Sequence, residues 1–400
     1  MFYSCLLAAG LAVGQPAMPK RVDSTEKSAD TYRQEITETT VFQNGQGGYL
    51  CYRIPAIVKA PNGHLLAFAE GRRTDCGDFG DVDIVLRTSK DNGQSWSPIQ
   101  TVADFGTMQA GNMAPVFDLT DSRFPNGKLF LIYNTGTASE ANVRKGLAVR
   151  EVWYKTSTDN GQTWSDAVNI TTQVSRPNKP DLNPSYAFPE DWRSYANTPG
   201  HALQIQKGRY KGRIFVAANH SEGQPQPQFH DYRAHGFYSD DHGQTWKLSP
   251  TIPYPGGNES TAAETANGSL LLNARNQSGD VKNRLLAFSR DAGESWESVV
   301  VATDLPDPVC EGSMITYQPR RGSSMLIFSN ANSQTSRTNL TVRTSQDDGK
   351  SWSAGKPIYA GSAAYSDLVI QQDGTIGVLY EKDNYTKITY ARFSYEWLVK

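Results

Sequence analysis

One eight-residue pattern occurs five times in the chain, and this repeat constrains the fold more than any other feature. The pattern is Ser-x-Asp-x-Gly-x-Ser/Thr-Trp, and strand-like runs of alternating apolar and polar residues precede its copies. The copies begin at Ser89, Ser157, Ser239, Ser289 and Ser345. A repeat of roughly 50 residues with four short strands in each unit is typical of the blades of a β-propeller.

Each copy of the pattern predicts a tight turn in which every residue has a structural task. The aspartate accepts hydrogen bonds from backbone N–H groups, the glycine takes a backbone conformation that other residues resist, and the tryptophan packs underneath. Five of the eight tryptophans in the chain stand at this last position. Because a turn that recurs in every unit belongs to the fold, we do not expect the repeated aspartates to be catalytic.

The net charge and the position of the apolar segments exclude some classes of protein. The net charge of −2 over 400 residues argues against nucleic acid or an anionic membrane as a partner. The N-terminal run MFYSCLLAAGLAVGQPA predicts a signal peptide over residues 1–20. The pair Lys20-Arg21 is a dibasic processing motif or two solvated charges. No other segment reaches the ~20 apolar residues of a membrane span, so we expect a secreted, extracellular protein with one domain over residues 35–400.

The cysteines predict at most one disulfide. Removal of the signal peptide leaves Cys51, Cys76 and Cys310, and Cys51 with Cys76 is the favoured pair because the two are close in sequence. No CxxC or HExxH motif occurs, so we assign no metal and no cofactor. Seven Asn-x-Ser/Thr sequons permit glycosylation of a secreted chain, at Asn169, Asn219, Asn258, Asn267, Asn276, Asn339 and Asn384.

The repeat resembles the Asp box of sialidase-type propellers. Five boxes imply an all-β, six-bladed β-propeller whose sixth blade is closed by segments from both chain ends. Five further segments resemble those that form the active sites of exo-α-sialidases, especially secreted fungal enzymes. They are YRIP at 52–55, DFGDVDIVLR from Asp78, NESTAAETANGSLLLNARN from Asn258, SQTSRTNLTVRTSQDDGKSW from Ser333 and AAYSDLVIQQDGTIGVLYE from Ala363.

The resemblance implies a carboxylate-binding triad of Arg53, Arg275 and Arg337. Sialic acids carry a carboxylate on the anomeric carbon, and a guanidinium group can hold a carboxylate through two parallel hydrogen bonds. Arginines from three blades can converge at a propeller axis, where a single blade cannot supply all three. Arg343 lies close to Arg337 in the sequence and competes with it for the third position.

The resemblance also implies that Tyr365 is the nucleophile and that Glu259 accepts its proton, with Glu264 as the competing carboxylate. The ordinary pKa of tyrosine is about 10, so an adjacent base must take up the phenolic proton. A neutral phenol can approach an anomeric carbon whose carboxylate would repel a second carboxylate. Sialidases are accordingly the tyrosine-dependent exception among glycosidases.

Four aspartates crowd the segment TDCGDFGDVDIVLR. Asp83 lies within a predicted strand and Asp81 at its start, so both are expected to be structural. A general acid needs a loop position that reaches the leaving oxygen, which leaves Asp75 and Asp78, and the resemblance selects Asp78. EF-hand spacing is absent, which argues against calcium. Arg72 is expected to contact the substrate, at its carboxylate or its C4 region, or to pair with a neighbouring aspartate.

These residues together imply an exo-α-sialidase. Its substrates would be glycans ending in N-acetylneuraminic acid or in the deaminated analogue KDN, cleaved with retention through a tyrosyl-enzyme intermediate. A non-catalytic sialoside-binding propeller would keep the arginines without the acid, base and nucleophile. A glycosidase acting on neutral polysaccharide would need a carboxylate pair instead of the arginines, and a trans-sialidase would differ at its acceptor site.

Overall fold

The computed structural model describes Met1 and residues 36–400, apart from Ser298 and Arg321. Residues Ile36–Lys400 form one compact unit. The predicted signal peptide, beyond Met1, and the dibasic pair lie outside the described residues. Within the described part of the chain, no helix is both long and apolar enough to cross a membrane.

The strands of this unit divide into six groups of four, as the all-β propeller prediction requires. Blade one contains β2 (Cys51–Lys59), β3 (Leu65–Arg72), β4 (Val82–Ser89) and β5 (Gln100–Ala103). Blade two contains β6 (Gln109–Asp118), β7 (Lys128–Gly136), β8 (Arg150–Ser157) and β9 (Val168–Asn169). Blade three contains β10 (Trp192–Asn197), β12 (Ile214–Glu222), β13 (Tyr232–Ser239) and β14 (Lys247–Leu248), and β11 (Leu203–Gln204) pairs with β12.

The second half of the chain builds the other three blades. Blade four contains β15 (Gly257–Glu264), β16 (Leu270–Asn276), β17 (Asn283–Ser289) and β18 (Val300–Pro306). Blade five contains β19 (Gly312–Tyr317), β20 (Met325–Ala331), β21 (Thr338–Ser345) and the first half of β22 (Lys356–Ile370). Blade six contains the second half of β22, β23 (Ile376–Lys382), β24 (Lys387–Phe393) and β1 (Ile36–Gln43).

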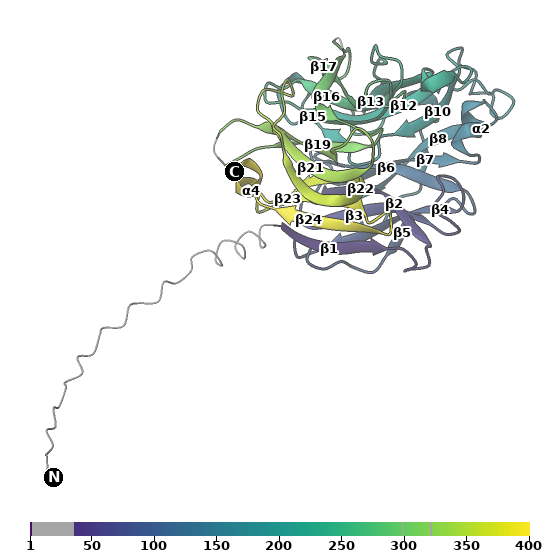
Figure 1. The fold of residues 1–400 in the computed structure, drawn as a ribbon. Helices are drawn as coiled ribbons and strands as arrows, with labels where there is room; N and C mark the ends of the chain where they lie inside the picture. The colour runs from purple at the N-terminus through teal and green to yellow at the C-terminus, as the bar shows by residue number, and fades with distance from the viewer. Residues whose placement is uncertain (2–35, 298, 321) are drawn as a thin grey trace. The chain divides into compact units, whose positions relative to one another are not determined.

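Blade six joins the two ends of the described unit. Strand β1 pairs antiparallel with β24, and Figure 1 shows the purple β1 beside the yellow β24. The sixth blade is therefore shared between the chain ends, as the count of five boxes implied. Short helices lie between strands: α2 (Glu140–Arg144), α3 (Thr171–Val174), and the 3-10 turns η1 (Gly208–Tyr210) and η2 (Pro227–Phe229); α4 (Tyr395–Val399) follows the last strand, β24.

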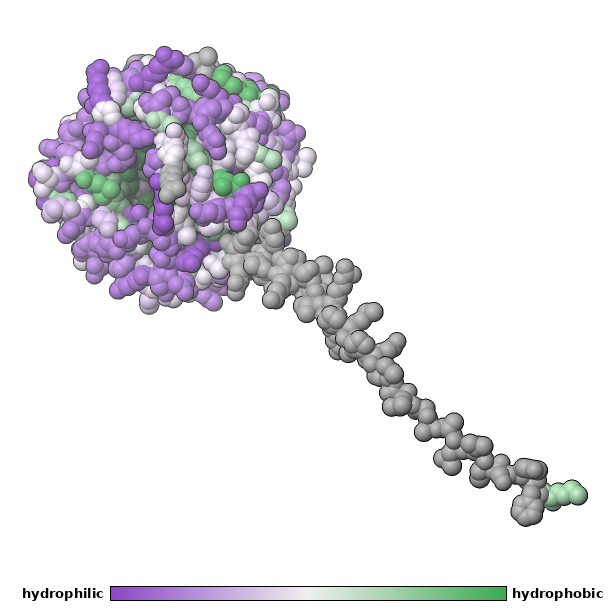
Figure 2. All heavy atoms as spheres, turned by 90° about the vertical axis from the view of Figure 1, so that its left-hand side faces the viewer, coloured by the Kyte–Doolittle hydropathy of each residue, from purple (hydrophilic) through white to green (hydrophobic). Residues whose placement is uncertain are grey.

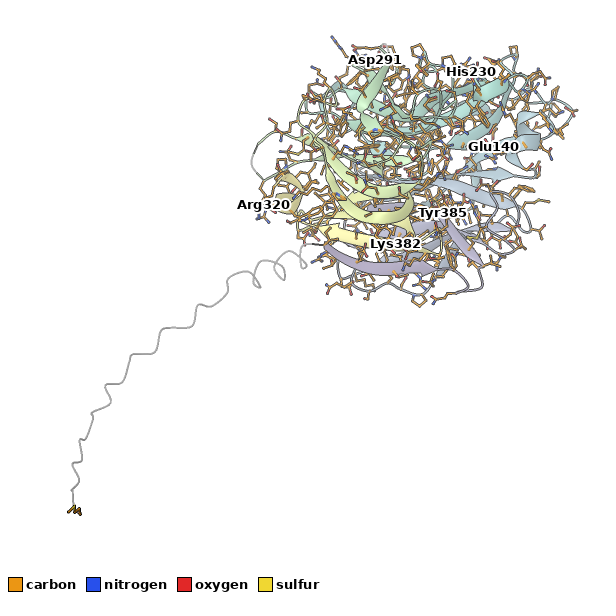
Figure 3. All side chains as sticks on the ribbon, viewed as in Figure 1. Glu140, His230, Asp291, Arg320, Lys382 and Tyr385 are labelled. Atoms are coloured by element: carbon orange, nitrogen blue, oxygen red, sulfur yellow. A yellow bond between two sulfur atoms is a disulfide. The ribbon has the colours of Figure 1, made fainter. Side chains whose placement is uncertain are left out.

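The repeated box forms the turn between the third and fourth strands of blades one to five. In blade three, the Ser239 hydroxyl donates to Asp241 at 2.8 Å, and the Gly243 N–H donates to that hydroxyl at 2.8 Å. Gly243 has a φ of +79°, and a Cβ there would lie 2.5 Å from Phe130. Asp291 of the blade-four copy lies just beyond the end of β17 (Figure 3). The boxes are thus structural turns, as predicted.

Apolar side chains of neighbouring blades pack against each other, as Phe130 of blade two does in a cluster with Trp192 and Val216 of blade three, and much of the surface is polar (Figure 2). The face shown in Figure 2 is mostly hydrophilic, with a few small apolar patches. Inside, β2 contacts β6 and β22, and β19 contacts β15 and β22, so the first strands of different blades meet. This arrangement brings segments distant in the sequence to a common cavity.

Candidate active site

A polar cavity draws its walls from five of the six blades. Its lining is formed mainly by charged and amide side chains, with Ile54 and Ala196 as the apolar members. The lining residues are Ile54, Glu70, Arg72, Asp78, Gln109, Asn112, Glu140, Arg150, Ala196, Asn219, Asn258, Glu259, Arg275 and Tyr365. Five of the seven site residues expected from the sequence are among them, and the other two, Arg53 and Arg337, lie beside Tyr365.

Tyr365 and Glu259 form the centre of the site. Tyr365 lies in β22 with 6% of its surface exposed, and its hydroxyl contacts both carboxylate oxygens of Glu259, at 2.7 and 2.8 Å. Arg275 lies 2.6 Å from the Glu259 carboxylate and donates to the Tyr365 oxygen at 3.0 Å. Burial raises the pKa of Tyr365 well above its ordinary value, so the phenol holds its proton at rest. Burial also raises the pKa of Glu259, against the opposing charge of Arg275.

The three predicted arginines converge on this tyrosine from three different blades. The guanidinium carbon of Arg53, from β2, lies 5.7 Å from the centre of the Tyr365 ring. That of Arg337, which directly precedes β21, lies 5.4 Å from the same ring, while Arg275 from β16 contacts the hydroxyl. The site therefore holds three permanent positive charges within reach of one bound anion.

Sequence reasoning missed the residues that hold these arginines. Glu381 accepts from Arg53 at 2.6 Å and from the backbone N–H of Ile54 and of Tyr365, at 2.9 and 3.2 Å. The side chain of Asn258 accepts from Arg275. Both residues lie within the segments quoted above, at the first position of one and the last position of another. Asn258 bonds to an arginine of its own segment, whereas the partner of Glu381 lies 328 residues away.

Tyr385 is a further contact of the triad that the sequence did not reveal. The Arg53 guanidinium lies 4.2 Å from the centre of its ring, and Arg337 donates to its hydroxyl at 3.4 Å. Asp383, Asn384 and Tyr385 all have positive φ, at 52°, 54° and 63°. Consecutive left-handed residues are strained, and such strain is often found at functional sites. Figure 3 labels Tyr385 in the hairpin between β23 and β24.

Asp78 lies at the cavity wall with 76% of its side chain exposed. It accepts from Arg72 Nη1 at 2.9 Å, and Arg72 is itself buried and bonded to Glu70 at 2.7 Å. Partial removal from water raises the pKa of Asp78, but the charges of Arg72 and Arg53 outweigh this effect and lower it. Arg72 thus pairs with an aspartate, one of the two alternatives; its contact with substrate stays a prediction.

The other aspartates of the segment have structural partners. Asp75 accepts from the backbone N–H of Gly77 at 2.6 Å, and Asp81 lies 3.3 Å from Arg73. Asp83 is buried and accepts from Tyr49 at 2.7 Å and from Arg73 at 2.6 Å. Of the four, Asp78 is the one that lines the cavity.

The two competing site residues lie elsewhere. Glu264 accepts from the backbone N–H groups of Gln206 and Lys207, at 2.9 and 3.0 Å. Arg343 donates to Asn330 at 3.3 Å. Glu259 lines the polar cavity and Arg337 lies 5.4 Å from the centre of the Tyr365 ring, so the geometry favours these two residues.

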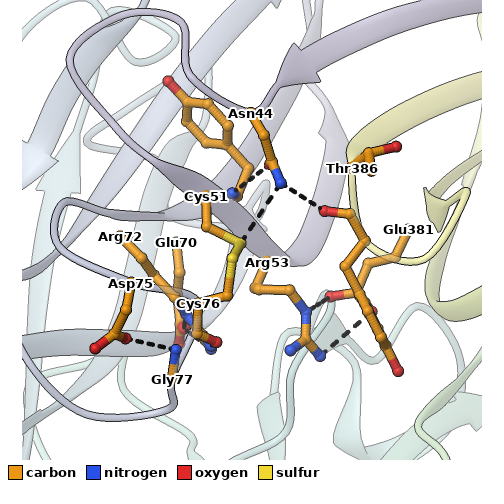
Figure 4. Close-up of a disulfide and its surroundings, with 12 residues drawn as sticks. Asn44, Cys51, Arg53, Glu70, Arg72, Asp75, Cys76, Gly77, Glu381 and Thr386 are labelled. Carbon is orange, nitrogen blue, oxygen red and sulfur yellow. Dashed lines mark hydrogen bonds and ion pairs between the residues drawn. A yellow bond between two sulfur atoms is a disulfide. The ribbon is translucent and has the colours of Figure 1, made fainter.

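Cys51 and Cys76 form the disulfide that the sequence favoured, and Cys310 is a buried free thiol. The disulfide joins the start of β2, two residues before Arg53, to the loop two residues before Asp78 (Figure 4). It therefore ties together two parts of the wall of the site.

One cluster among the described residues has metal-like spacing, formed by Asp118, Asp121 and His242. Its oxygens already have protein donors: Asp118 accepts from Gln204 at 2.6 Å, and Asp121 accepts from Arg123 at 2.7 Å. The cluster does not line the polar cavity. We therefore interpret the cluster as a hydrogen-bonded turn.

Comparison with known proteins gives concordant matches. Residues 63–378 match a family model described as BNR repeat-like domain. The chain is 34% identical to a sialidase of Micromonospora viridifaciens over 90% of its own length and 54% of that protein, so it spans about half of that relative. It is 28% identical to an exo-alpha-sialidase of Aspergillus fumigatus over 88% of this chain and 86% of that protein.

A vertebrate relative and a solved structure cover similar ranges. The chain is 30% identical to Sialidase-2 of Cricetulus griseus, over 90% of this chain and 95% of that protein. The structure of Hadza microbial sialidase Hz136 superposes with a TM-score of 0.77 at 25% identity, over 90% of this chain and 69% of that chain. The matches thus extend across nearly all of the described unit.

Proposed function

The chain belongs to the sialidase family, and we propose from this premise that it is an exo-α-sialidase that hydrolyses terminal, non-reducing sialic acids from glycoconjugates. One observation carries the proposal beyond family membership. The Tyr365 hydroxyl contacts Glu259 at 2.7 Å, with three arginines around it and a loop aspartate at the cavity wall. A protein that only bound sialosides would need the arginines but not this nucleophile–base pair.

The arginines account for recognition of the substrate. Arg53 is neutralised by Glu381 and Arg275 by Glu259, whereas Arg337 donates to the Val309 carbonyl and the Tyr385 hydroxyl, which are neutral partners. The cluster therefore keeps a net positive charge that a carboxylate can balance. Bidentate guanidinium contacts would fix the carboxylate and, with it, the adjacent anomeric carbon over Tyr365.

Cleavage proceeds in two displacements. In the first, Asp78 donates its proton to the leaving oxygen while the Tyr365 oxygen attacks the anomeric carbon and passes its proton to Glu259. In the second, Asp78 takes a proton from water, whose oxygen attacks the anomeric carbon. The Tyr365 oxygen leaves and recovers its proton from Glu259. Two inversions give net retention, and each group ends in the state in which it began.

The acid role of Asp78 has a direct test. Asp78→Asn is expected to lower kcat/KM for natural sialosides by about 10²–10⁴-fold, the usual contribution of a general acid. Aryl sialosides with good leaving groups need little protonation and should lose far less in the first displacement. Equal losses on both substrate types would contradict the assignment. No sialoside hydrolysis by the unmodified protein would refute the proposed function itself.

We also propose that the site accepts KDN as well as N-acetylneuraminic acid. The cavity wall contributed by blade two is polar, and it contains the Gln109 Oε1 and Arg150 Nε atoms, which are buried and have no hydrogen-bond partner among the described residues. Such atoms cost free energy unless a ligand satisfies them, and a sugar hydroxyl can do so where an acetyl methyl cannot. Paired aryl α-glycosides of the two sugars test this. Hydrolysis of the N-acetyl glycoside alone would contradict it.

We propose that the protein is secreted and glycosylated, as the N-terminal sequence predicts. The disulfide favours an oxidising compartment. The sequons divide by burial: Asn219, Asn258 and Asn276 are buried, Asn339 is half-buried, and Asn169, Asn267 and Asn384 are exposed. After expression through a eukaryotic secretory pathway, we expect glycans at the exposed asparagines and none at the buried ones. Mass spectrometry of the deglycosylated peptides checks this, and an intracellular, unglycosylated product would contradict it.

A further inference from the structure

We propose that the Cys51–Cys76 disulfide is a positioning element for the general acid, because it holds the Asp78 loop in place while Asp78 carries the proton. The inference rests on the proposed sialidase function. It concerns the loop at residues 73–81, which connects β3 to β4, and not the fold as a whole.

The loop is attached to the blade at its base and depends on further anchors nearer Asp78. At the base, Arg73 binds Asp81 at 3.3 Å and the buried Asp83 of β4 at 2.6 Å, while Asp75 accepts from Gly77 within the loop. Residues 73–78 are all exposed, including Cys76 and Asp78. The loop therefore depends on a few anchors to keep the carboxyl group of Asp78 at the cavity.

The first anchor, Arg72, depends partly on charge. Its Nη1 donates to Asp78 at 2.9 Å and to the Cys76 carbonyl oxygen at 2.6 Å. Ionised Asp78 makes a charge-assisted bond to Arg72, but Asp78 must be protonated to act as an acid, and that bond then weakens. The catalytic cycle thus removes part of this anchor at the moment when the position of Asp78 matters most.

The second anchor, the disulfide, does not depend on the charge of Asp78. Its Cys51 end is buried at the start of β2, opposite Arg72 in the register of β2 and β3. Asn44 contacts the Cys51 sulfur at 3.8 Å and accepts from the backbone N–H of Tyr52 at 3.0 Å, as Figure 4 shows for the surroundings of the disulfide. A rigid strand therefore holds one sulfur, and through it the exposed loop.

The disulfide also limits the separation of two functional groups, Arg53 and Asp78. Arg53 follows Cys51 by two residues and Asp78 follows Cys76 by two residues. Arg53 would hold the carboxylate of the bound sugar, and Asp78 would reach its leaving oxygen. A covalent link between their neighbours limits how far these two groups can separate, and misplacement of a reacting group by about 1 Å can cost about 10²-fold in rate.

The experiment compares substrates that differ in their need for an acid. The double variant Cys51→Ser/Cys76→Ser and the unmodified protein would be assayed on sialyllactose and on aryl sialosides ranging from phenyl to dinitrophenyl. We expect the variant to lose about tenfold in kcat/KM for sialyllactose and less than about twofold for the most activated aryl sialoside. The dependence of log kcat/KM on the pKa of the leaving group should therefore become steeper.

Reduction of the unmodified protein gives a second, independent measurement. Cys76 is exposed, so dithiothreitol should reduce the bond in the folded protein and reproduce the steeper dependence, while leaving the double variant unaffected. A uniform loss on all substrates would show a purely structural bond and overturn the proposal, as would no loss at all. These outcomes are distinct from failure of the proposed function, which would appear as an unmodified protein that cleaves no sialoside.

Discussion

Substitution of Glu259 by glutamine separates catalysis from binding. The variant should have a lower kcat but a higher affinity for a carboxylate ligand. Glutamine keeps the size of the side chain and an oxygen that can accept from Tyr365, so the fold should survive. The glutamine side chain cannot take up the phenolic proton, because its amide is not a base. It also removes the negative charge that lies 2.6 Å from Arg275.

The magnitudes follow from these two losses. A general base contributes about 10²–10⁴-fold to rate, so kcat should fall by that factor, or about 2.7–5.4 kcal/mol in the barrier. The site gains one net positive charge beside the bound carboxylate. Two unit charges about 5 Å apart interact by about 0.8 kcal/mol even at the dielectric constant of water, and by more in a buried site. A carboxylate ligand should therefore bind about fourfold more tightly, or better.

The assay pairs steady-state kinetics on an aryl sialoside with calorimetric titration of a planar 2,3-unsaturated sialic acid analogue. Glu264→Gln is the matched control, since Glu264 lies on the same strand but binds the backbone of Gln206 and Lys207 outside the cavity. We expect it to change thermal stability and leave kcat unchanged. A Glu259→Gln protein with near-normal kcat, or with weakened analogue binding, would refute the assignment of Glu259 as the base beside the carboxylate site.

Three further perturbations test other parts of the structure. Tyr365→Phe should abolish turnover while analogue binding survives, and a 3-fluoro sialosyl fluoride should label Tyr365 in the unmodified protein; label on another residue would contradict the nucleophile. Trp246→Ala should lower the free energy of unfolding by about 3–5 kcal/mol, because Trp246 is 4% exposed. Trp296→Ala should lower it by less, because Trp296 is only partly buried. Equal losses in denaturant melts of the two variants would contradict this. Burial lowers the pKa of His220 and His235 well below the ordinary value, so at acidic pH the unfolded chain binds protons that the folded protein does not. The free energy of unfolding should therefore decrease as the pH falls below about 6.5, by about 1.4 kcal/mol per pH unit for each histidine. His235→Gln should flatten this dependence in melts across pH, and an unchanged slope would contradict it.

The repeated turns could be predicted because their chemistry is local. The bonds of Ser239 with Asp241 and Gly243 span four residues, so the residue pattern already contains both partners. For a chain with five boxes, the resemblance implied six blades. The resemblance named Tyr365, Glu259 and the arginines, and the structure brought them together around one cavity.

What the sequence could not determine was which groups would face each other across the blades. Arg53 and its partner Glu381 are 328 residues apart, and no local pattern connects them. Tyr385 likewise meets Arg53 because blade six packs beside blade one, where β2 contacts β22 and β23. The sequence by itself determined the turns, the strands and the residue types available for catalysis, since these depend on neighbours along the chain. The tertiary structure decided their pairing, and with it their charge and protonation, because those depend on burial and on partners that only the closed propeller brings within a few ångströms.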